Sequence, residues 1–172
     1  MTGAAHARTS GLDELREALE GEVVAPSDGA AAWDDARQAW NLAVDQRPAA
    51  VALPRSAADV VAIVRFAREQ GLRVAPQGTG HGAAALGDLE DTILLKTSLL
   101  RGVAIDPERR IARVEAGAIW IEVVEAAAAH GLAALAGSSP DVGVVGYTLG
   151  GGLSWLSRRY GSARTASPRS SS

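Results

Sequence analysis

A short glycine-rich stretch that contains a histidine has the clearest chemical potential in this sequence. Residues 78–82 read Gly-Thr-Gly-His-Gly and directly follow Pro76 and Gln77. Three glycines in five positions let backbone N–H groups come close to a bound group, and His81 adds a nucleophile or a proton-transfer group. Glycine also marks ordinary turns, so this stretch by itself is equally consistent with a turn that contains an incidental histidine. It matches neither the G-x-G-x-x-G pattern nor the Walker A pattern.

A second glycine-rich region, residues 137–152, strengthens the interpretation of the first. It ends in three consecutive glycines, Gly150 to Gly152. Ordering such a run costs much entropy, so a folded chain is expected to keep it where the backbone must approach something closely. A pyrophosphate bound by backbone N–H groups has this requirement. Two separate glycine loops therefore suit a ligand with two phosphates and two bulky ends.

The first glycine stretch follows a predicted strand–helix–strand unit. Strands are predicted at 48–54 and 72–75, and the helix between them begins after the N-cap Ser56 and ends at Gly71. Asp59, three residues after Ser56, makes a pair that resembles a capping box. A turn after such a unit is a common place for a ligand.

Short elements precede and follow this unit. Helices are predicted at 13–19, 31–40, 119–130 and 153–160, and strands at 92–95, 103–106 and 111–115. The turn at 106–109 makes the last two strands a hairpin. Trp33 and Trp40 are one heptad apart, so we expect them to share a face of the 31–40 helix and to serve packing.

The composition limits the possible classes of function. The 172 residues include no cysteine, which excludes disulfides and thiolate metal sites, and the net charge of −3 with scattered basic residues argues against a nucleic-acid partner. Three dispersed histidines predict no metal site, and no serine lies in the G-x-S-x-G pattern of hydrolases. No apolar stretch is long enough for a membrane span and the N-terminus lacks a signal-peptide layout, so we expect a cytoplasmic protein without a membrane partner.

From residue 48 to residue 161 the sequence resembles the FAD-binding domain of the vanillyl-alcohol oxidase/p-cresol methylhydroxylase flavoproteins, and within them the berberine-bridge-enzyme-like and bacterial FAD-linked oxidases. The resemblance rests on motifs in a fixed order: Pro54-Arg55-Ser56, Gly78-Thr79-Gly80-His81, Pro140-Asp141-Val142-Gly143, Gly150-Gly151-Gly152 and Arg159-Tyr160-Gly161. It implies an α+β fold of the p-cresol methylhydroxylase type, a βαβ unit plus a mixed sheet and helices. The expected divisions are a leader with short helices at 1–46, the FAD-binding domain at 47–161 and a disordered Ser/Arg tail at 162–172.

The resemblance also implies which residues contact FAD. They are Gln77, Gly78, Thr79, Gly80, His81 and Gly82 in the first stretch, and Pro140, Asp141, Val142, Gly143, Gly146, Tyr147, Gly150, Gly151 and Gly152 in the second. His81 occupies the position where many members bond a histidine to the flavin 8α-methyl group. Ser139 stands where members with two covalent bonds have a cysteine, so the resemblance implies one bond at most. Val142 matches a position thought to control access of oxygen, and a valine there favours an oxidase.

The implied function is an FAD-dependent oxidoreductase that moves a hydride from a small organic substrate to flavin N5 and is reoxidised by O2. Members continue beyond the triple glycine with further strands and a substrate domain that usually supplies the catalytic base. We therefore expect this sequence to be truncated at its C-terminus and to contain no catalytic base. Two alternatives stay open: an inactive or non-enzymatic FAD-binding fragment, and a flavoprotein that resembles UDP-sugar reductases and binds FAD without a covalent bond.

Overall fold

The chain folds as two compact units, residues 1–99 and residues 100–172. The structure is a computed structural model and describes residues 11–166. The predicted leader at residues 1–10 and the last six residues of the predicted tail, 167–172, lie outside the described residues. No helix within the described range is long and apolar enough to cross a membrane.

Four strands make up the sheet of the first unit, in the spatial order β1 (Glu22–Val24), β2 (Ala50–Leu53), β4 (Thr92–Lys96) and β3 (Arg73–Gln77). Strands β2 and β3 both run parallel to β4, and β1 runs antiparallel to β2. Helix α4 (Ala57–Glu69) connects β2 to β3, and β4 lies between these two strands. The predicted βαβ unit is confirmed, and β3 extends two residues beyond its predicted end.

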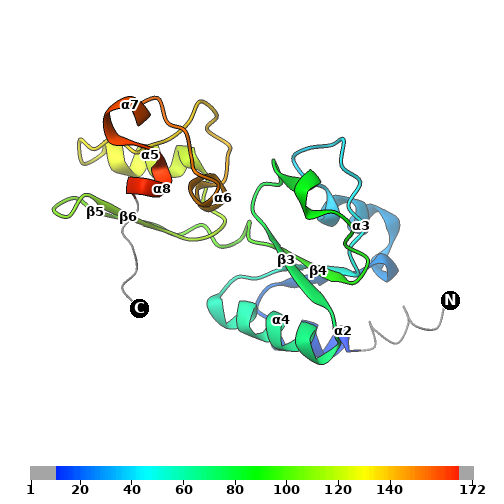
Figure 1. Ribbon diagram of the computed structural model, residues 1–172. Coiled ribbons are helices and arrows are strands. Elements are labelled where there is room, and N and C mark those ends of the chain that lie inside the picture. Colours follow the sequence, from blue (N-terminus) through cyan, green and yellow to red (C-terminus); the bar gives the residue numbers. More distant parts are fainter. Residues whose placement is uncertain (1–10, 167–172) are drawn as a thin grey trace. The chain divides into compact units, whose positions relative to one another are not determined.

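Both faces of this sheet are covered by helices (Figure 1). Helices α2 (Leu12–Ala18) and α4 pack on one face, and α3 (Ala30–Arg37) packs on the other. Successive side chains of β2 point to opposite faces, so Ala52 joins the core under α2 and α4 while Val51 joins the core under α3. A short 3-10 turn, η1 (Pro26–Asp28), precedes α3.

A buried carboxylate fixes the beginning of α4. Asp59 is 2% exposed, and its two carboxylate oxygens accept hydrogen bonds from the backbone N–H groups of Glu20, Gly21 and Arg55 at 3.1, 3.0 and 2.8 Å. The Ser56 hydroxyl accepts a bond from the Asp59 N–H, as the predicted N-cap requires. Burial by itself would raise the pKa of Asp59, but these hydrogen bonds outweigh burial and lower it.

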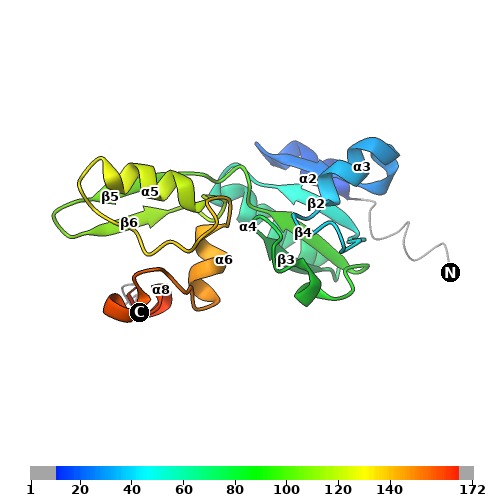
Figure 2. The same ribbon diagram turned by 90° about the horizontal axis from the view of Figure 1, so that it is seen from above.

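In its described part, residues 100–166, the second unit contains a hairpin and four helices. Strands β5 (Val103–Asp106) and β6 (Ile111–Val114) pair antiparallel, and α5 (Trp120–Ala128) packs against them (Figure 1, Figure 2). The helices that follow are α6 (Val144–Leu149), α7 (Ser157–Tyr160) and α8 (Ala163–Ala166). Trp120, Val123 and Val144 form the buried core of this unit.

Two predictions for the second unit were wrong. The region 137–152 was expected to be a loop, but α6 occupies its centre, because Val144 and Tyr147 pack into the core formed with Trp120. The tail from residue 162 was expected to be disordered, but residues 163–166 form α8. The backbone N–H of Ala163 donates to the carbonyl of Gly152 at 2.9 Å, and this bond fixes the start of α8.

Candidate FAD site

The first glycine loop, residues 78–82, lies at the carboxyl end of β3. Ligands bind at this end of the strands in open parallel sheets. The carbonyl of Gln77 accepts a 3.0 Å bond from the N–H of Thr97, and the carbonyl of Gly80 accepts a 3.2 Å bond from Ala83, the first residue of η2 (Ala83–Leu86). Backbone hydrogen bonds therefore hold the residue before the loop and the residue at its centre.

Gly80 and Gly82 are glycines for different reasons. Gly80 has a φ of +89°, and a Cβ atom there would lie 2.9 Å from the Cβ and 3.1 Å from the Cα of Ala39. Its identity is thus required by the fold of the first unit itself. Gly82 has φ −94° and ψ 19°, and nothing lies within 4 Å of the position that a Cβ would take. No described contact of the chain requires glycine at position 82, and the space beside it is open.

Two buried polar side chains beside this loop have no hydrogen-bond partner within the described residues. They are the Gln77 side-chain amide, on a residue that is 5% exposed, and Nε2 of the half-buried His81. Buried polar atoms are nearly always hydrogen-bonded, so each orphaned atom calls for a partner. An amide and an imidazole beside a glycine-rich backbone can receive a ligand that carries several acceptor oxygens. The residues of this loop therefore fit a cofactor with a pyrophosphate.

Trp40 belongs with this loop, although the sequence analysis assigned it to packing. Trp33 does pack against the core under α3, but α3 ends at Arg37, so the two tryptophans do not share a helix face. The indole of Trp40 is 58% exposed and stacks on the imidazole of His81, with ring centroids 3.9 Å apart and an angle of 28° between the planes. The heptad spacing hid this contact, because it predicted one helix through both tryptophans.

Within the second glycine-rich region, residues 140–144 are fixed by backbone hydrogen bonds to the start of α5. The carbonyls of Val142 and Pro140 accept bonds from the N–H groups of Trp120 and Ile121 at 3.0 and 2.9 Å. The N–H of Val144 in turn donates to the carbonyl of Ala118 at 3.0 Å. These bonds use N–H groups at the N-terminus of α5 that would otherwise lack partners in the helix. The segment is therefore anchored to the start of α5 by backbone hydrogen bonds alone, without a ligand.

Packing around Tyr147 explains two glycines of the second region. A Cβ at Gly152 would lie 2.5 Å from the Tyr147 ring and 2.7 Å from the Cβ of Ala163, and a Cβ at Gly137 would lie 3.1 Å from the same ring. The ring also contacts Trp120 edge to face, with centroids 5.2 Å apart. Burial raises the pKa of Tyr147, whose hydroxyl has no partner within the described residues. At least one residue of the triple glycine, Gly152, is therefore required by packing inside the second unit, whether or not a ligand is nearby.

The remaining predicted contacts of the second region differ in exposure. Val142 is half-buried and packs against the core of the second unit. Gly143 is buried at the start of α6. The others are exposed or half-exposed on α6 or beside it: Pro140, Asp141, Gly146, Gly150 and Gly151. Gly151 has a φ of +112° with nothing within 4 Å of the position that a Cβ would take, so its glycine serves the backbone conformation. The six predicted contacts at 77–82 belong to the first unit and the nine at 140–152 belong to the second.

Comparison with known proteins identifies the family. Residues 48–166 match the model of a FAD binding domain, which extends five residues beyond the predicted end of the domain at residue 161. An (R)-6-hydroxynicotine oxidase from Paenarthrobacter nicotinovorans is 34% identical over 145 residues, which cover 84% of this chain and 31% of that protein.

Two solved structures resemble the chain closely. A BBE-like 1 variant from Physcomitrella patens matches with a TM-score of 0.81 at 26% identity, over 90% of this chain and 34% of that one. A glucooligosaccharide oxidase from Acremonium strictum, whose FAD is 6-S-cysteinyl, 8α-N1-histidyl FAD, matches with a TM-score of 0.74 at 28% identity, over 95% of this chain and 33% of that one. The chain thus spans about a third of the length of these relatives. By its sequence match and its fold, it belongs to the FAD-binding domain family of the vanillyl-alcohol oxidase/p-cresol methylhydroxylase type.

Proposed function

We propose that this protein is an FAD-dependent oxidoreductase, an oxidase that takes a hydride from a small organic substrate. Its family supports FAD as the cofactor, and the hydroxynicotine and glucooligosaccharide oxidases among its relatives support a small organic substrate. When bound, FAD supplies the ring that accepts the hydride and gives the electrons up to dioxygen. The role of this chain is to hold and orient that cofactor.

The observation that carries the proposal is the pair of orphaned polar side chains beside the first glycine loop. Nε2 of His81 and the amide of Gln77 are buried without partners in the described part of the chain. Gly82 leaves open space where a side chain would stand. In the proposed site the backbone N–H groups of residues 78–82 bind the pyrophosphate, and the side-chain amide of Gln77 donates a further hydrogen bond to it.

His81 is the proposed point of covalent attachment. When FAD is bound, one imidazole nitrogen of His81 would hold it through the flavin 8α position, and dioxygen would be the oxidant that such an attachment requires. Because Ser139 cannot form a thioether, attachment is through His81 alone. A nitrogen substituent at C8α withdraws electron density from the ring, which favours hydride acceptance.

The second unit contributes a rigid backbone segment and Val142. Hydrogen bonds to the start of α5 fix residues 140–144, so this segment loses little entropy when it contacts a ligand. The remaining proposed contacts are Gly146, Tyr147, Gly150, Gly151 and Gly152. Val142 is the proposed control on oxygen access, since its small side chain leaves room that a larger one would fill.

Acid precipitation tests the covalent bond. The full chain is incubated with FAD and precipitated with acid, and flavin fluorescence is measured in the washed pellet. The wild type should retain fluorescence and His81→Asn should lose it, while the matched control His130→Asn, at an exposed histidine after α5, should behave like the wild type. Equal fluorescence in the wild-type and His81→Asn pellets would refute attachment at His81. Flavin found only in the supernatant of the wild type would indicate non-covalent binding.

Stopped-flow spectroscopy tests the oxidase assignment. The flavin-loaded protein is reduced anaerobically with dithionite and mixed with air-saturated buffer. Rapid return of the oxidised flavin absorbance is expected, and Val142→Leu should slow it. Slow reoxidation of the wild type would show that the protein is not an oxidase.

A further inference from the structure

Residues 38–46, which follow α3 and precede β2, form a segment whose residues Ala39 and Trp40 lie directly against the first glycine loop. The backbone N–H of Trp40 donates to the carbonyl of Thr79 at 3.1 Å, and the Trp40 indole stacks on His81 at 3.9 Å between ring centroids. Between these two contacts, Ala39 is 3% exposed and packs so closely on Gly80 that a Cβ there would come within 2.9 Å. Three consecutive loop residues are thus contacted by two consecutive residues of this segment.

Burial alone does not explain the position of Trp40. Its side chain is 58% exposed, whereas Trp33 lies against the core under α3. Because most of the Trp40 side chain stays in water, burial contributes little to its stabilisation. Its stacking on another ring contributes more. The contact that distinguishes Trp40 is the stack on His81.

His81 needs such a contact, because its neighbours in the chain cannot confine it. Both flanking residues, Gly80 and Gly82, lack side chains. Without a packing partner the imidazole would sample several rotamers, and a reacting group that must be ordered at the moment of reaction loses rate. The face of the indole restricts the plane of the ring.

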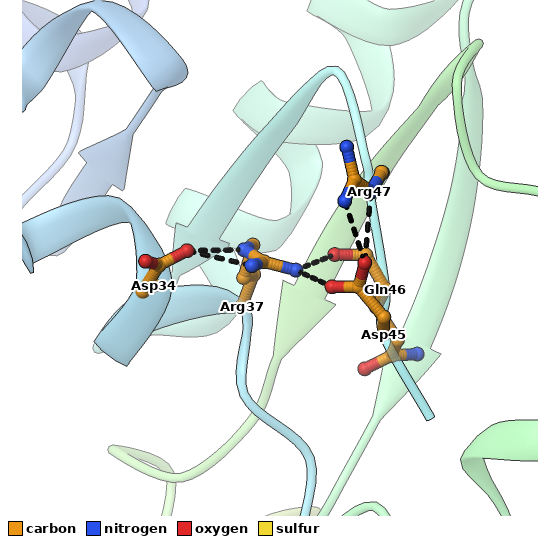
Figure 3. A network of polar contacts seen from close by, with 5 residues as sticks. All are labelled: Asp34, Arg37, Asp45, Gln46 and Arg47. Atoms are coloured by element: carbon orange, nitrogen blue, oxygen red, sulfur yellow. Dashed lines mark hydrogen bonds and ion pairs between the residues drawn. The ribbon is translucent and has the colours of Figure 1, made fainter. Parts of the chain in front are cut away.

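An ion-pair network holds the segment at both ends (Figure 3). Arg37, at the end of α3, bonds to Asp34 at 2.6 Å, to the carboxylate of Asp45, and to the carbonyl of Gln46 at 2.8 Å. Asp45 also accepts a bond from Arg47 at 2.9 Å. The two arginines lower the pKa of Asp45, Arg37 having the larger effect, so the carboxylate stays charged at neutral pH. The network ties the beginning of the segment to its end.

Lys96 of β4 fixes the segment to the sheet. Its ammonium group donates to the carbonyls of Ala36 and Gln38 at 2.9 and 2.8 Å. These carbonyls lie at the C-terminal end of α3, where a cation is favourable and where the helix has unpaired acceptors. Lys96 thus ends α3 just before Trp40 and lets the chain turn toward the loop.

We propose that Trp40 is a positioning residue for His81, with its indole setting the plane of the imidazole and with Arg37 and Lys96 holding the segment that carries it. The inference rests on the proposed role of His81 in flavin attachment. Trp40 itself takes no part in the bond. Phenylalanine at this position retains a stacking face, and alanine does not.

The orientation of His81 is measured first, without flavin, on the full chain labelled with ¹³C and ¹⁵N at histidine. Ring protons of His81 should resonate upfield of those of His130, because they lie over the indole. Trp40→Ala should remove this shift and Trp40→Phe should keep part of it. Trp155→Ala, the control at another exposed tryptophan, should leave it unchanged. A His81 spectrum that is the same in wild type and Trp40→Ala would overturn the proposal.

The rate of flavin attachment is measured next, as pellet fluorescence against time after FAD is added. Trp40→Ala should slow attachment about two- to tenfold, the factor expected for loss of one aromatic pair, and Trp40→Phe should restore most of it. An unchanged rate in a variant that has lost the upfield shift would refute positioning. If wild type attaches no flavin, the proposed function fails, while the spectra still decide whether Trp40 orients His81.

A second variant covers the case in which Trp40→Ala does not fold. Lys96→Met keeps the length of the side chain, removes the donor to Ala36 and Gln38, and does not touch His81. It should weaken the upfield shift of the His81 ring and slow attachment in the same direction as Trp40→Ala. A folded Lys96→Met protein with a wild-type shift and rate would refute the role of Lys96.

Discussion

Substitution of Gly80 by alanine is expected to destabilise the first unit strongly. The φ of +89° is unfavourable for alanine, at a cost of about 1–3 kcal/mol. The new Cβ would also lie 2.9 Å from the Cβ and 3.1 Å from the Cα of Ala39, and overpacking of this kind adds about 1–3 kcal/mol. Because Ala39 has no flexible side chain that could move aside, its backbone must shift. The free energy of unfolding should fall by about 2–6 kcal/mol in total.

Gly82→Ala is the matched control, two residues along the same loop. Its φ of −94° suits alanine and the Cβ meets nothing within 4 Å, so the fold should be unchanged or more stable by up to about 1 kcal/mol. If FAD approaches this glycine as proposed, the same substitution should weaken FAD binding about tenfold or more, which corresponds to about 1.4 kcal/mol. The two variants therefore separate a glycine needed by the fold from one needed by the ligand.

Urea denaturation gives the free energies, and hydrogen exchange of peptides from β2 and β4 shows whether the loss lies in the first unit. FAD affinity is measured by quenching of flavin fluorescence. Equal stability of Gly80→Ala and wild type would refute the steric argument. A Gly82→Ala protein that binds FAD like wild type would refute the placement of the ligand at this glycine.

Three further substitutions test other buried or half-buried positions. Asp59→Asn should lower the free energy of unfolding by about 3 kcal/mol at pH 7, since an amide cannot accept all three backbone N–H bonds. Because the pKa of Asp59 is lowered by folding, this difference from wild type should be fully present above the ordinary value of 3.8 and shrink as pH falls through the folded-state pKa; urea titrations between pH 3 and 7 that show no such trend would contradict it. Gly152→Ala should cost about 2–6 kcal/mol, because its φ is +61° and its Cβ would enter the Tyr147 ring. Tyr147→Phe removes a buried hydroxyl without a described partner and should stabilise the protein by about 1 kcal/mol. Melting curves in which Tyr147→Phe is less stable than wild type would refute this assignment.

Local signals in the sequence predicted the elements of the first unit well. Ser56 and Gly71 bounded α4 to within a residue or two, because caps act through hydrogen bonds to near neighbours. The same signals could not reveal what Asp59 does. Besides Arg55, its carboxylate binds the N–H groups of Glu20 and Gly21, which lie 39 and 38 residues away, and only the folded chain brings them together.

Helix α6 and the site of Trp40 were missed for a related reason. The α6 sequence contains two valines, a threonine and a glycine, which are weak helix formers, and the helix depends on packing of Val144 and Tyr147 against Trp120. Trp40 was predicted to lie in the helix at 31–40, but α3 ends at Arg37. Lys96, far along the chain, donates hydrogen bonds to the carbonyls of Ala36 and Gln38 at this end. In both cases a long-range contact overrode the local pattern.

The glycines that first suggested a ligand prove to answer three different physical needs. Gly80 makes room for Ala39, Gly152 makes room for Tyr147 and Ala163, and Gly151 adopts a backbone conformation that other residues avoid. Only Gly82 among these four combines a φ that any residue can adopt with open space at its Cβ position. A count of glycines in the sequence cannot separate these cases, because all four would show the same letter in the same kind of run. Backbone conformation and Cβ space do separate them. By both criteria the fold needs no glycine at Gly82, beside His81, or at Gly146 of the second region, so substitutions there test the proposed ligand contacts most directly.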